Sequence, residues 1–448
     1  MKQQLIERAT WELVAWFGIA IALSIAASFY ISWAGVVIVF ALLAIFIAVV
    51  ARPVWGVYAL AAAAPLSGLA ISFASEQSLS RVPYLGGIEA PVVDFIAIIL
   101  LVAAPIIFFI NHKKIFPAHI KNHLPWFLLW FAAVAAAVYF GDPIYFGTSL
   151  KAFFRPYLFT YLAFVLPILL FVNRRAEIIY AAVAYEIACL AGALMGAVSI
   201  FVTSSIGFPR AEPFAIFGYI PFGTNHNVLA ESLTAIIPFA VWWASEQKTR
   251  AAKIFWGGAA ALIAIVSALT FSRAAWIVLA LQGLGWLWFF GKHTGRRRVA
   301  IVAVVAVVAL FFMWIENTAV ADSSNATRTD LTGIALTYFN RAPLTGQGPG
   351  TFIQLVGETA AFRLDYGDPL DAHGFLQKVM AETGALGTIA FLALLISLGW
   401  RLWKRRHSAF EAVWFFTFIS LWAYQLFNTG YFDGKVWVLV GLCLASLL

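Results

Sequence analysis

The sequence predicts an all-α polytopic membrane protein, and composition, apolar periodicity and the placement of charge support this prediction. Of the 448 residues, 63% are hydrophobic and 11% are charged, and the mean hydropathy is +0.89. Apolar stretches of about 17 to 25 residues recur from Trp11 to the C-terminus, each long enough to cross a hydrocarbon layer of roughly 30 Å as a helix. A soluble globular protein is therefore excluded. We expect about 12–14 transmembrane helices with one long, partly helical loop on the outer side.

The candidate spans follow from the length of each apolar stretch. The N-terminal segment has Lys2 and Arg8 but no small-residue cleavage site after its first apolar run, so we interpret it as a retained span rather than a signal peptide. The first two and the last two spans form short hairpins, and omission of one hairpin leaves about twelve spans with the same orientation. The candidate spans are roughly 12–31, 34–50, 54–74, 91–110, 124–140, 156–172, 178–203, 228–245, 252–270, 274–290, 299–315, 386–403, 410–428 and 433–448.

The distribution of Lys and Arg predicts the orientation, because short cytoplasmic loops of membrane proteins are rich in these residues. With the N-terminus inside, even-numbered spans end in the cytoplasm, where the sequence has Lys113-Lys114 with Lys121, Arg174-Arg175, Lys248 to Lys253, Lys292 to Arg298 and Lys404 to Arg406. The segment Asn325–Gly387 is then on the outer face. The chain is predicted to divide into an N-terminal transmembrane bundle, an outer loop and C-terminal transmembrane helices, at residues 1–315, 316–385 and 386–448.

Polar residues of the second half of the chain are concentrated in Asn325–Gly387. Thr327 or Thr329 can cap a helix that begins near Arg328, with an apolar face at helical spacing. This helix should end before the run Pro343–Gly350, in which alternating Gly permits turn conformations and Pro cannot continue a helix.

A second helix in this segment is predicted to begin at Asp371, whose carboxylate can cap it, and to end at Gly384. His373 then lies in the first turn, where the helix dipole disfavours the imidazolium and keeps the ring neutral, as a general base requires. A metal site made by Asp365, Asp368, Asp371 and His373 is the alternative. Its spacing matches no familiar metal motif, and exposed acidic residues are usually solvated.

A second population of cations lies on the outer side or at the outer ends of spans. Each could be an interfacial anchor, since Arg reaches headgroups readily. Several on one face indicate an anion site, because guanidinium presents a planar fork suited to phosphate oxygens. Lys151 and Arg155 are four residues apart and should share one helical face, with an anion from a lipid or a substrate between them. The full set is Lys151, Arg155, Arg210, Arg273, Arg328, Arg341 and Arg363.

Arg273 sits between two apolar spans with almost no loop. A charge at the centre of a span costs on the order of 2.5–3.5 kcal/mol, and less near the ends, so Arg273 should have a partner. The run Asn225-His226-Asn227 indicates a helix start that could hold an oxyanion or sugar hydroxyls, with His226 as an alternative base. Glu231, one turn later, could pair with an outer arginine or bond to neighbours.

Together these motifs resemble the bacterial O-antigen ligase and O-antigen polymerase superfamily. The similarity is strongest over about residues 220–390. One departure is Gly374, because the family usually has Asn after this histidine. The residues that carry the resemblance are Gly223-Thr-Asn-His-Asn227, Ser272-Arg273, Arg328, Pro343-Leu-Thr-Gly-Gln-Gly-Pro-Gly350, Asp371-Ala-His-Gly-Phe-Leu-Gln377 and Glu382-Thr-Gly384.

The resemblance implies a GT-C-like, metal-independent glycosyltransferase with no cofactor in the bacterial inner membrane, its catalytic loop in the periplasm. The donor would be a glycan on undecaprenyl diphosphate, and the acceptor the lipid A–core of lipopolysaccharide (ligase) or a glycan (polymerase); no nucleic-acid partner is expected. His373 and Arg273 would be catalytic. The residues that would bind the diphosphate are Arg155, Arg210, Arg273, Arg328 and Lys151. The residues that would bind the substrate are Asn225, Asn227, Asp371 and Gln377.

Two functions of other classes stay open at this point. A small-anion transporter fits any hydrophobic chain of this length, and Asp94 and Glu186, in or near spans, could mark an ion pathway. Secondary transporters tend to have internal repeats and midplane polar sites, whereas this chain has no convincing repeat and its polar residues gather at one face. A lipid-binding assembly protein without catalysis is the third possibility. Cys189 and Cys443 fall inside apolar spans, so the sequence supports neither a disulfide framework nor a Cys-based metal site.

Overall fold

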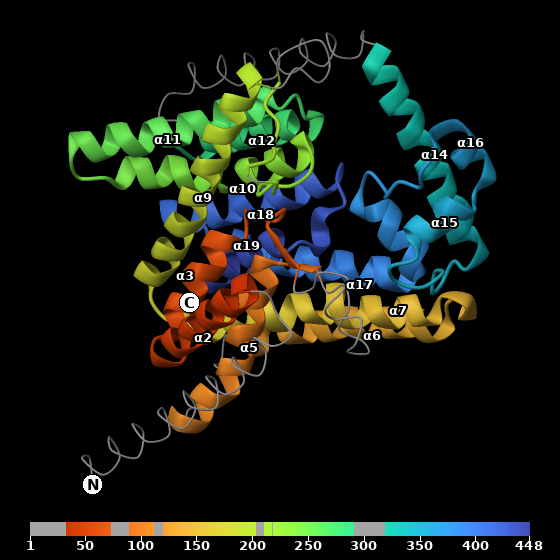
Figure 1. Cartoon of the computed structure of the whole chain (residues 1–448), viewed down its shortest axis with the longest axis horizontal. Helices are drawn as coiled ribbons and strands as arrows, with labels where there is room; N and C mark the ends of the chain where they lie inside the picture. Colours follow the sequence, from red (N-terminus) through yellow and green to blue (C-terminus); the bar gives the residue numbers. More distant parts are fainter. Residues whose placement is uncertain (1–32, 73–88, 112–119, 203–209, 217, 291–318) are drawn as a thin grey trace.

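The computed structural model describes residues 33–72, 89–111, 120–202, 210–216, 218–290 and 319–448, and these form a helical bundle (Figure 1). The spans predicted at 12–31 and 299–315 and the cation clusters at 113–114 and 292–298 lie outside the described residues. The first half contains α2 (Trp33–Ala51), α3 (Pro53–Ala63), β1 (Ala70–Ser72), β2 (Glu89–Pro91), α5 (Val92–Asn111), η1 (Ile120–Asn122), α6 (Leu124–Phe140), η2 (Pro143–Tyr145), α7 (Phe146–Ala152), the π-helical segments η3 (Phe153–Leu158) and η4 (Thr160–Val165), α8 (Leu166–Phe171) and α9 (Arg175–Val202). The second half contains α10 (His226–Glu246), α11 (Arg250–Leu269), α12 (Arg273–Phe290), α14 (Ala319–Arg341), α15 (Phe352–Glu358), α16 (Ala360–Tyr366), α17 (Phe375–Arg405), α18 (Ala409–Gln425), η5 (Gly430–Phe432) and α19 (Gly434–Ala445).

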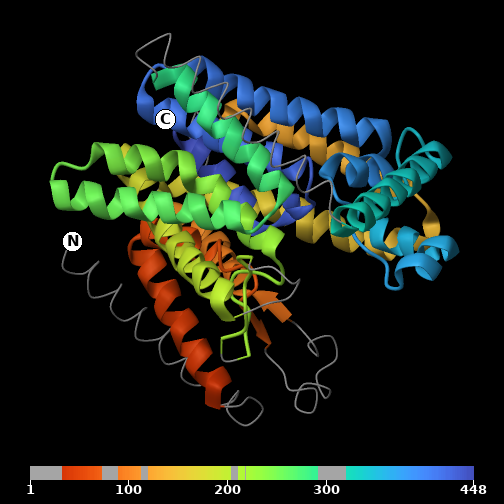
Figure 2. The same cartoon turned by 90° about the horizontal axis from the view of Figure 1, so that it is seen from above.

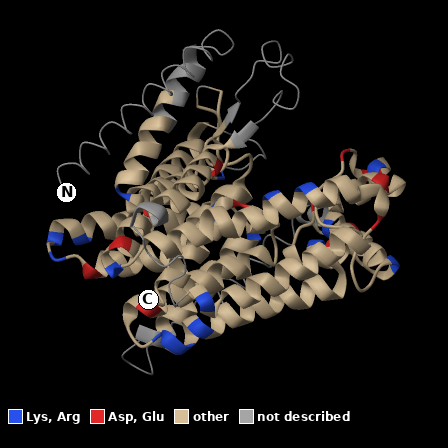
Figure 3. Ribbon diagram, turned by 90° about the horizontal axis from the view of Figure 1, so that it is seen from below, with Lys and Arg blue, Asp and Glu red and all other residues tan. Residues whose placement is uncertain are grey.

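The structure confirms an all-α polytopic membrane protein. Within the described residues, the non-helical regular structure is one antiparallel pair of three-residue strands, β1 and β2. Many Lys, Arg, Asp and Glu residues lie toward the ends of the long helices (Figure 3), whereas Glu186 lies in the middle of α9. The number of spans stays a prediction. Five described helical stretches are long and apolar enough to cross a membrane, and these are Pro143–Phe171, Arg175–Val202, His226–Glu246, Arg250–Leu269 and Phe375–Arg405.

Aromatic side chains pack the centre of the bundle around Trp130. Its ring lies 4.8 Å from that of Phe391 and 5.3 Å from that of Tyr157, measured between centroids, and it stacks on Trp437 at 5.8 Å. These four residues come from α6, α17, η3 and α19, so one apolar cluster holds together helices that are distant in the sequence. Large aromatic side chains contribute strongly to such cores because of the area that they bury.

Helix α17 is broken at Gly384, and the turn run Pro343–Gly350 fills the break. Gly384 has φ +61°, a conformation that glycine adopts without steric cost. The amide of Gln347 donates to the carbonyl of Ala381 at 3.0 Å, and the amide of Ala385 donates to the carbonyl of Pro343 at 2.8 Å. The predicted helix end at Gly384 is thus a kink, because the turn run pairs the backbone groups that the kink exposes.

Helices α14, α15 and α16 lie together at one end of the molecule (Figure 2), where they share a small apolar core with α17. Helix α14 ends at Arg341, before Pro343 as predicted, but it begins at Ala319 rather than near Arg328. Thr329 does not cap it. Its hydroxyl instead donates to the carbonyl of Asn325 at 2.9 Å, one turn earlier, as threonine does inside a helix.

Candidate active site

His373 lies in the loop that leads into α17. The helix begins at Phe375, with Gly374 as its N-cap, rather than at Asp371 as predicted. Asp371 does not cap the helix, because its carboxylate accepts from the amide of Ala372 at 2.9 Å and pairs with the ammonium of Lys378 at 2.7 Å. These two bonds hold the loop against the first turns of α17, so His373 is positioned by a rigid element.

Gly374 also has a clear structural reason. A Cβ at this position would lie 2.6 Å from the carbonyl oxygen of Leu426, at the end of α18. The close approach of these two backbones requires glycine where the resembling family usually has asparagine. The departure from the family pattern therefore reflects how α17 packs on α18 in this chain.

Two guanidinium groups accompany His373. Arg273 is the first residue of α12, and its guanidinium donates to the side-chain carbonyl of Asn325 in α14. Arg328, one turn after Asn325 in the same helix, is half-buried, and burial together with the nearby charge of Arg273 lowers its pKa. The partner that the sequence required for Arg273 is thus a neutral amide, and the positive charge of the pair is not cancelled by it.

The surroundings of His373 favour its neutral imidazole. Its pKa is lowered by burial and by the charges of Arg328 and Arg273, while Asp371 acts in the opposite direction. From the sequence, we expected the dipole of a helix that begins at Asp371 to keep the ring neutral. In the structure the ring lies just before the helix, and desolvation and two cations lower its pKa.

A buried tyrosine hydroxyl connects the helices that hold these groups. Tyr424 of α18 donates to the backbone carbonyl of Asn227 at 2.7 Å and lies 3.0 Å from the hydroxyl of Ser272, which precedes Arg273. The turn before Ser272 contains Phe271 at φ +54°, and strain of this kind is concentrated at functional sites. Sequence reasoning missed Tyr424, since one hydroxyl in an apolar helix does not reveal its partner.

The run Asn225-His226-Asn227 forms the predicted helix start. The side-chain carbonyl of Asn225 accepts from the amides of Asn227 and Val228 at 3.0 and 3.1 Å, so it caps α10. His226 is half-buried and lies within the electrostatic range of Arg210 and Arg328. The first turn of α10 and the His373 loop therefore share Arg328 as a nearby cation.

Two further predicted residues have protein partners. Arg210 pairs with Glu212 at 3.1 Å. Gln377 donates to the hydroxyl of Thr332 at 2.6 Å, one turn from Arg328, which ties the start of α17 to α14. Gln377 therefore lies near the His373 loop and helps to position α17 relative to α14, whereas Arg210 lies within the electrostatic range of His226.

Arg155 and Lys151 are not brought to His373 by any described contact. Arg155 pairs with Asp94 of α5 at 2.7 Å and lines a cavity with η5 and α19. It is not among the groups that shift the pKa of His373. Lys151 is exposed on α7, and the π-helical turns that follow it change the register that a regular helix would impose on the pair.

An ion pair buried in the bundle was also missed. Lys435 of α19 and Glu231 of α10 approach to 2.7 Å, with side chains 1% and 2% exposed. Glu231 accepts further bonds from Gln425 and, at 3.0 Å, from Asn428. Its partner is therefore a lysine about 200 residues away rather than an outer arginine.

No group of three or more His, Cys, Asp or Glu side chains in the described ranges is placed to hold a metal ion. Cys189 and Cys443 are free and buried, as their place in apolar segments predicted. Glu186 is buried in α9, and Asp94 has the partner described above.

Comparison with known proteins bears on the part of the chain that contains Arg273, Arg328 and His373. Residues 258–392 match the family model described as O-antigen ligase. No curated protein matches the chain. The matched range begins in α11 and ends in α17, so it includes the residues on which the resemblance was based, except for Gly223–Asn227.

Proposed function

Since the match over residues 258–392 supports membership of the O-antigen ligase superfamily, we propose that this chain is a membrane glycosyltransferase of the ligase type. The donor is a glycan on undecaprenyl diphosphate, and the acceptor is a sugar hydroxyl of lipid A–core at the periplasmic face. The observation that carries the proposal is that Arg273 and Arg328 lie within the electrostatic range of His373, although the three residues come from separate segments of the chain.

In this reaction the acceptor hydroxyl attacks the anomeric carbon of the donor sugar. A C–O bond to the acceptor forms, the C–O bond to the diphosphate breaks, and the hydroxyl proton passes to a base. The lowered pKa of His373 favours the neutral ring, which can accept this proton, and a positioned base contributes typically about 10²–10⁴-fold to the rate.

The leaving diphosphate carries growing negative charge, which fixed cations can stabilise in the transition state. Arg273 and Arg328 supply two guanidinium groups close to His373, with fork geometry suited to phosphate oxygens. Because their charges are not cancelled by a carboxylate in the described contacts, both are available for an anionic group. This arrangement meets the charge requirement of the leaving group from protein side chains.

Transfer assays in reconstituted membranes test these roles. His373→Ala and Arg273→Ala should each lose at least 100-fold in glycan transfer while the protein is inserted and abundant. Exposed His407 and exposed Arg405 offer matched controls, and His407→Ala and Arg405→Ala should retain activity. Full activity of both test variants would contradict the assignment.

The acceptor is decided by the glycans of a deletion strain. Long polymer that accumulates on the carrier lipid identifies a ligase, whereas single repeat units identify a polymerase of the same superfamily. The second result would correct the acceptor in this proposal and leave the roles of His373 and Arg273 in place.

A further inference from the structure

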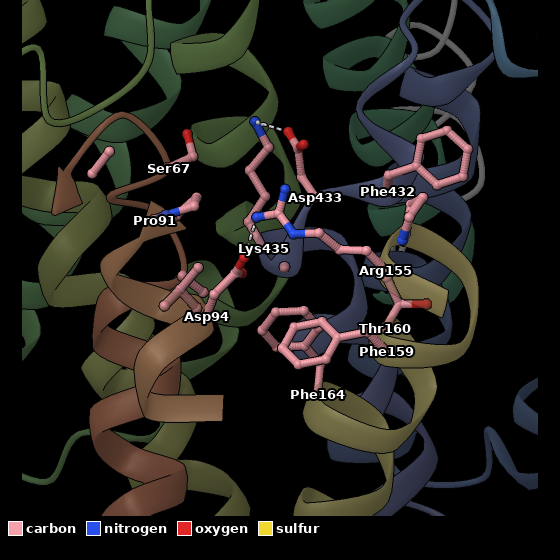
Figure 4. A pocket seen from close by; sticks show the side chains of 15 residues that line it. Ser67, Pro91, Asp94, Arg155, Phe159, Thr160, Phe164, Phe432, Asp433 and Lys435 are labelled. Atoms are coloured by element: carbon pink, nitrogen blue, oxygen red, sulfur yellow. Dashed lines mark hydrogen bonds and ion pairs between the residues drawn. The ribbon is translucent and has the colours of Figure 1, made fainter. Parts of the chain in front are cut away.

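A cavity of about 450 Å³ lies between the β1–β2 pair, α5, the π-helical segments and the η5–α19 turn. Small-ligand sites typically occupy roughly 300–1,000 Å³. In Figure 4, the guanidinium of Arg155 extends across the cavity to Asp94, and the ammonium of Lys435 meets Asp433. The rings of Phe159, Phe164 and Phe432 form the apolar part of the lining.

The charges of this cavity are balanced. Arg155 and Lys435 are its cations, and Asp94 and Asp433 are its anions. Behind the lining, Glu231 contacts Lys435 at 2.7 Å and adds a negative charge. A diphosphate would have to displace Asp94 from Arg155 and approach Asp433, which is unfavourable for a polyanion. This differs from the cluster at His373, where Arg273 is held by a neutral amide.

The lining combines the two features that a polyhydroxyl ligand needs. Carboxylate oxygens accept charge-assisted bonds from hydroxyl groups, and the guanidinium of Arg155, whose side chain is 63% exposed, can donate to hydroxyl oxygens. Aromatic rings can cover the apolar C–H face of a sugar and remove it from water. The same cavity therefore offers partners to a neutral saccharide without the burial of an unpaired charge.

The cavity is linked to the His373 loop by direct contacts. Phe432 lines the cavity, and the ammonium of Lys378 lies 5.2 Å from the centroid of its ring. Lys378 in turn pairs with Asp371 at 2.7 Å, two residues before His373. These contacts connect the cavity with the loop that carries the proposed base.

We propose that this cavity binds an uncharged saccharide unit of a substrate, while the Arg273–Arg328 cluster binds the diphosphate. The assignment rests on the proposed glycosyltransferase function. It assigns Arg155 to sugar binding, whereas the resemblance implied that Arg155 binds the diphosphate. The reason is that its guanidinium is already paired with Asp94.

Binding to the full chain in detergent micelles tests the proposal. Saturation-transfer NMR with methyl α-glucopyranoside and N-acetylglucosamine as probes should show transfer to both sugars. The signal should fall at least fivefold in Asp433→Asn, which keeps the side-chain volume, and in Phe432→Leu. Asp368→Asn, at an exposed loop aspartate, is the matched control and should bind as the native chain does.

Competition distinguishes a sugar site from an anion or lipid-headgroup site. Pyrophosphate and phosphoethanolamine should not displace the sugars from the native chain. Asp94→Asn releases Arg155 and should create pyrophosphate binding that competes with sugar. Displacement from the native chain, no saturation transfer, or equal signals in Asp433→Asn and Asp368→Asn would each overturn the inference.

His373→Ala separates this inference from the proposed function. The variant should lose transfer and keep sugar binding. Loss of transfer in His373→Ala together with no Asp433-dependent sugar binding would overturn the cavity assignment alone. Retained transfer in His373→Ala would overturn the proposed function, and the binding result would then stand as evidence for a saccharide site of another role.

Discussion

The ion pair between Glu231 and Lys435 allows a prediction whose size and asymmetry both follow from the structure. At 2.7 Å, and with an effective dielectric constant of about 20, the Coulomb attraction is on the order of 6 kcal/mol. Desolvation of the two buried ions offsets most of this, so the pair contributes little net stability. Removal of one partner leaves a buried charge unpaired, which costs about 3–5 kcal/mol.

The two single variants should differ. Lys435→Met deprives Glu231 of the cation that contacts it in the described part of the chain, so the full cost of about 3–5 kcal/mol is expected. Glu231→Gln costs less, because Lys435 still has Asp433 at 3.2 Å. In the double variant no charge of the pair remains, and its unfolding free energy should be higher than that of Lys435→Met.

Unfolding of the purified protein by SDS titration in mixed micelles measures these free energies. Arg155→Met is the matched control, because the Arg155–Asp94 pair also has an N–O distance of 2.7 Å but its Arg side chain is 63% exposed. It should cost about 1 kcal/mol or less. A Glu231→Gln loss equal to or larger than that of Lys435→Met, or strict additivity in the double variant, would refute the reasoning.

Three further predictions concern the site and the kink. The charge of Arg328 is among the causes that lower the pKa of His373, so the rate of transfer should fall only as the pH drops through that lowered pKa. Arg328→Gln should raise the pKa of His373 and shift the acid limb of the kcat/KM–pH profile to higher pH. An acid limb at the same pH as in the native chain would contradict this. Gly384→Ala places a side chain at φ +61° against backbone and should destabilise the protein by roughly 1–3 kcal/mol. In the control Gly333→Ala, a Cβ meets nothing within 4 Å, and the variant should stabilise α14 by about 0.5–1 kcal/mol. Thermal unfolding of the two variants compares these effects. Tyr424→Phe removes the bonds to the Ser272 hydroxyl and the Asn227 carbonyl and should cost about 1–3 kcal/mol and reduce kcat; unchanged transfer would show that this hydroxyl does not position the site.

The role of Pro343–Gly350 shows how local and tertiary information divide. The Gly and Pro spacing predicted turns, and Gly346, Gly348 and Gly350 all have φ between +70° and +119°. What these turns do was not readable from the run itself. They pair with backbone groups on both sides of Gly384, more than thirty residues later in the chain.

The sequence by itself determined the membrane-embedded helical class, the burial of both cysteines and the end of α14 before Pro343, and it predicted the roles of Arg273 and His373. These conclusions depend on the length of apolar runs, on local backbone preferences and on the cost of a charge near the bilayer, all of which are local properties. The tertiary structure decided the start of α17, the pairing of Arg155 with Asp94 and of Glu231 with Lys435, and the hydrogen bonds of Tyr424. Each of these depends on which helices lie side by side, because a buried polar group bonds to whatever partner the packing brings within about 3 Å.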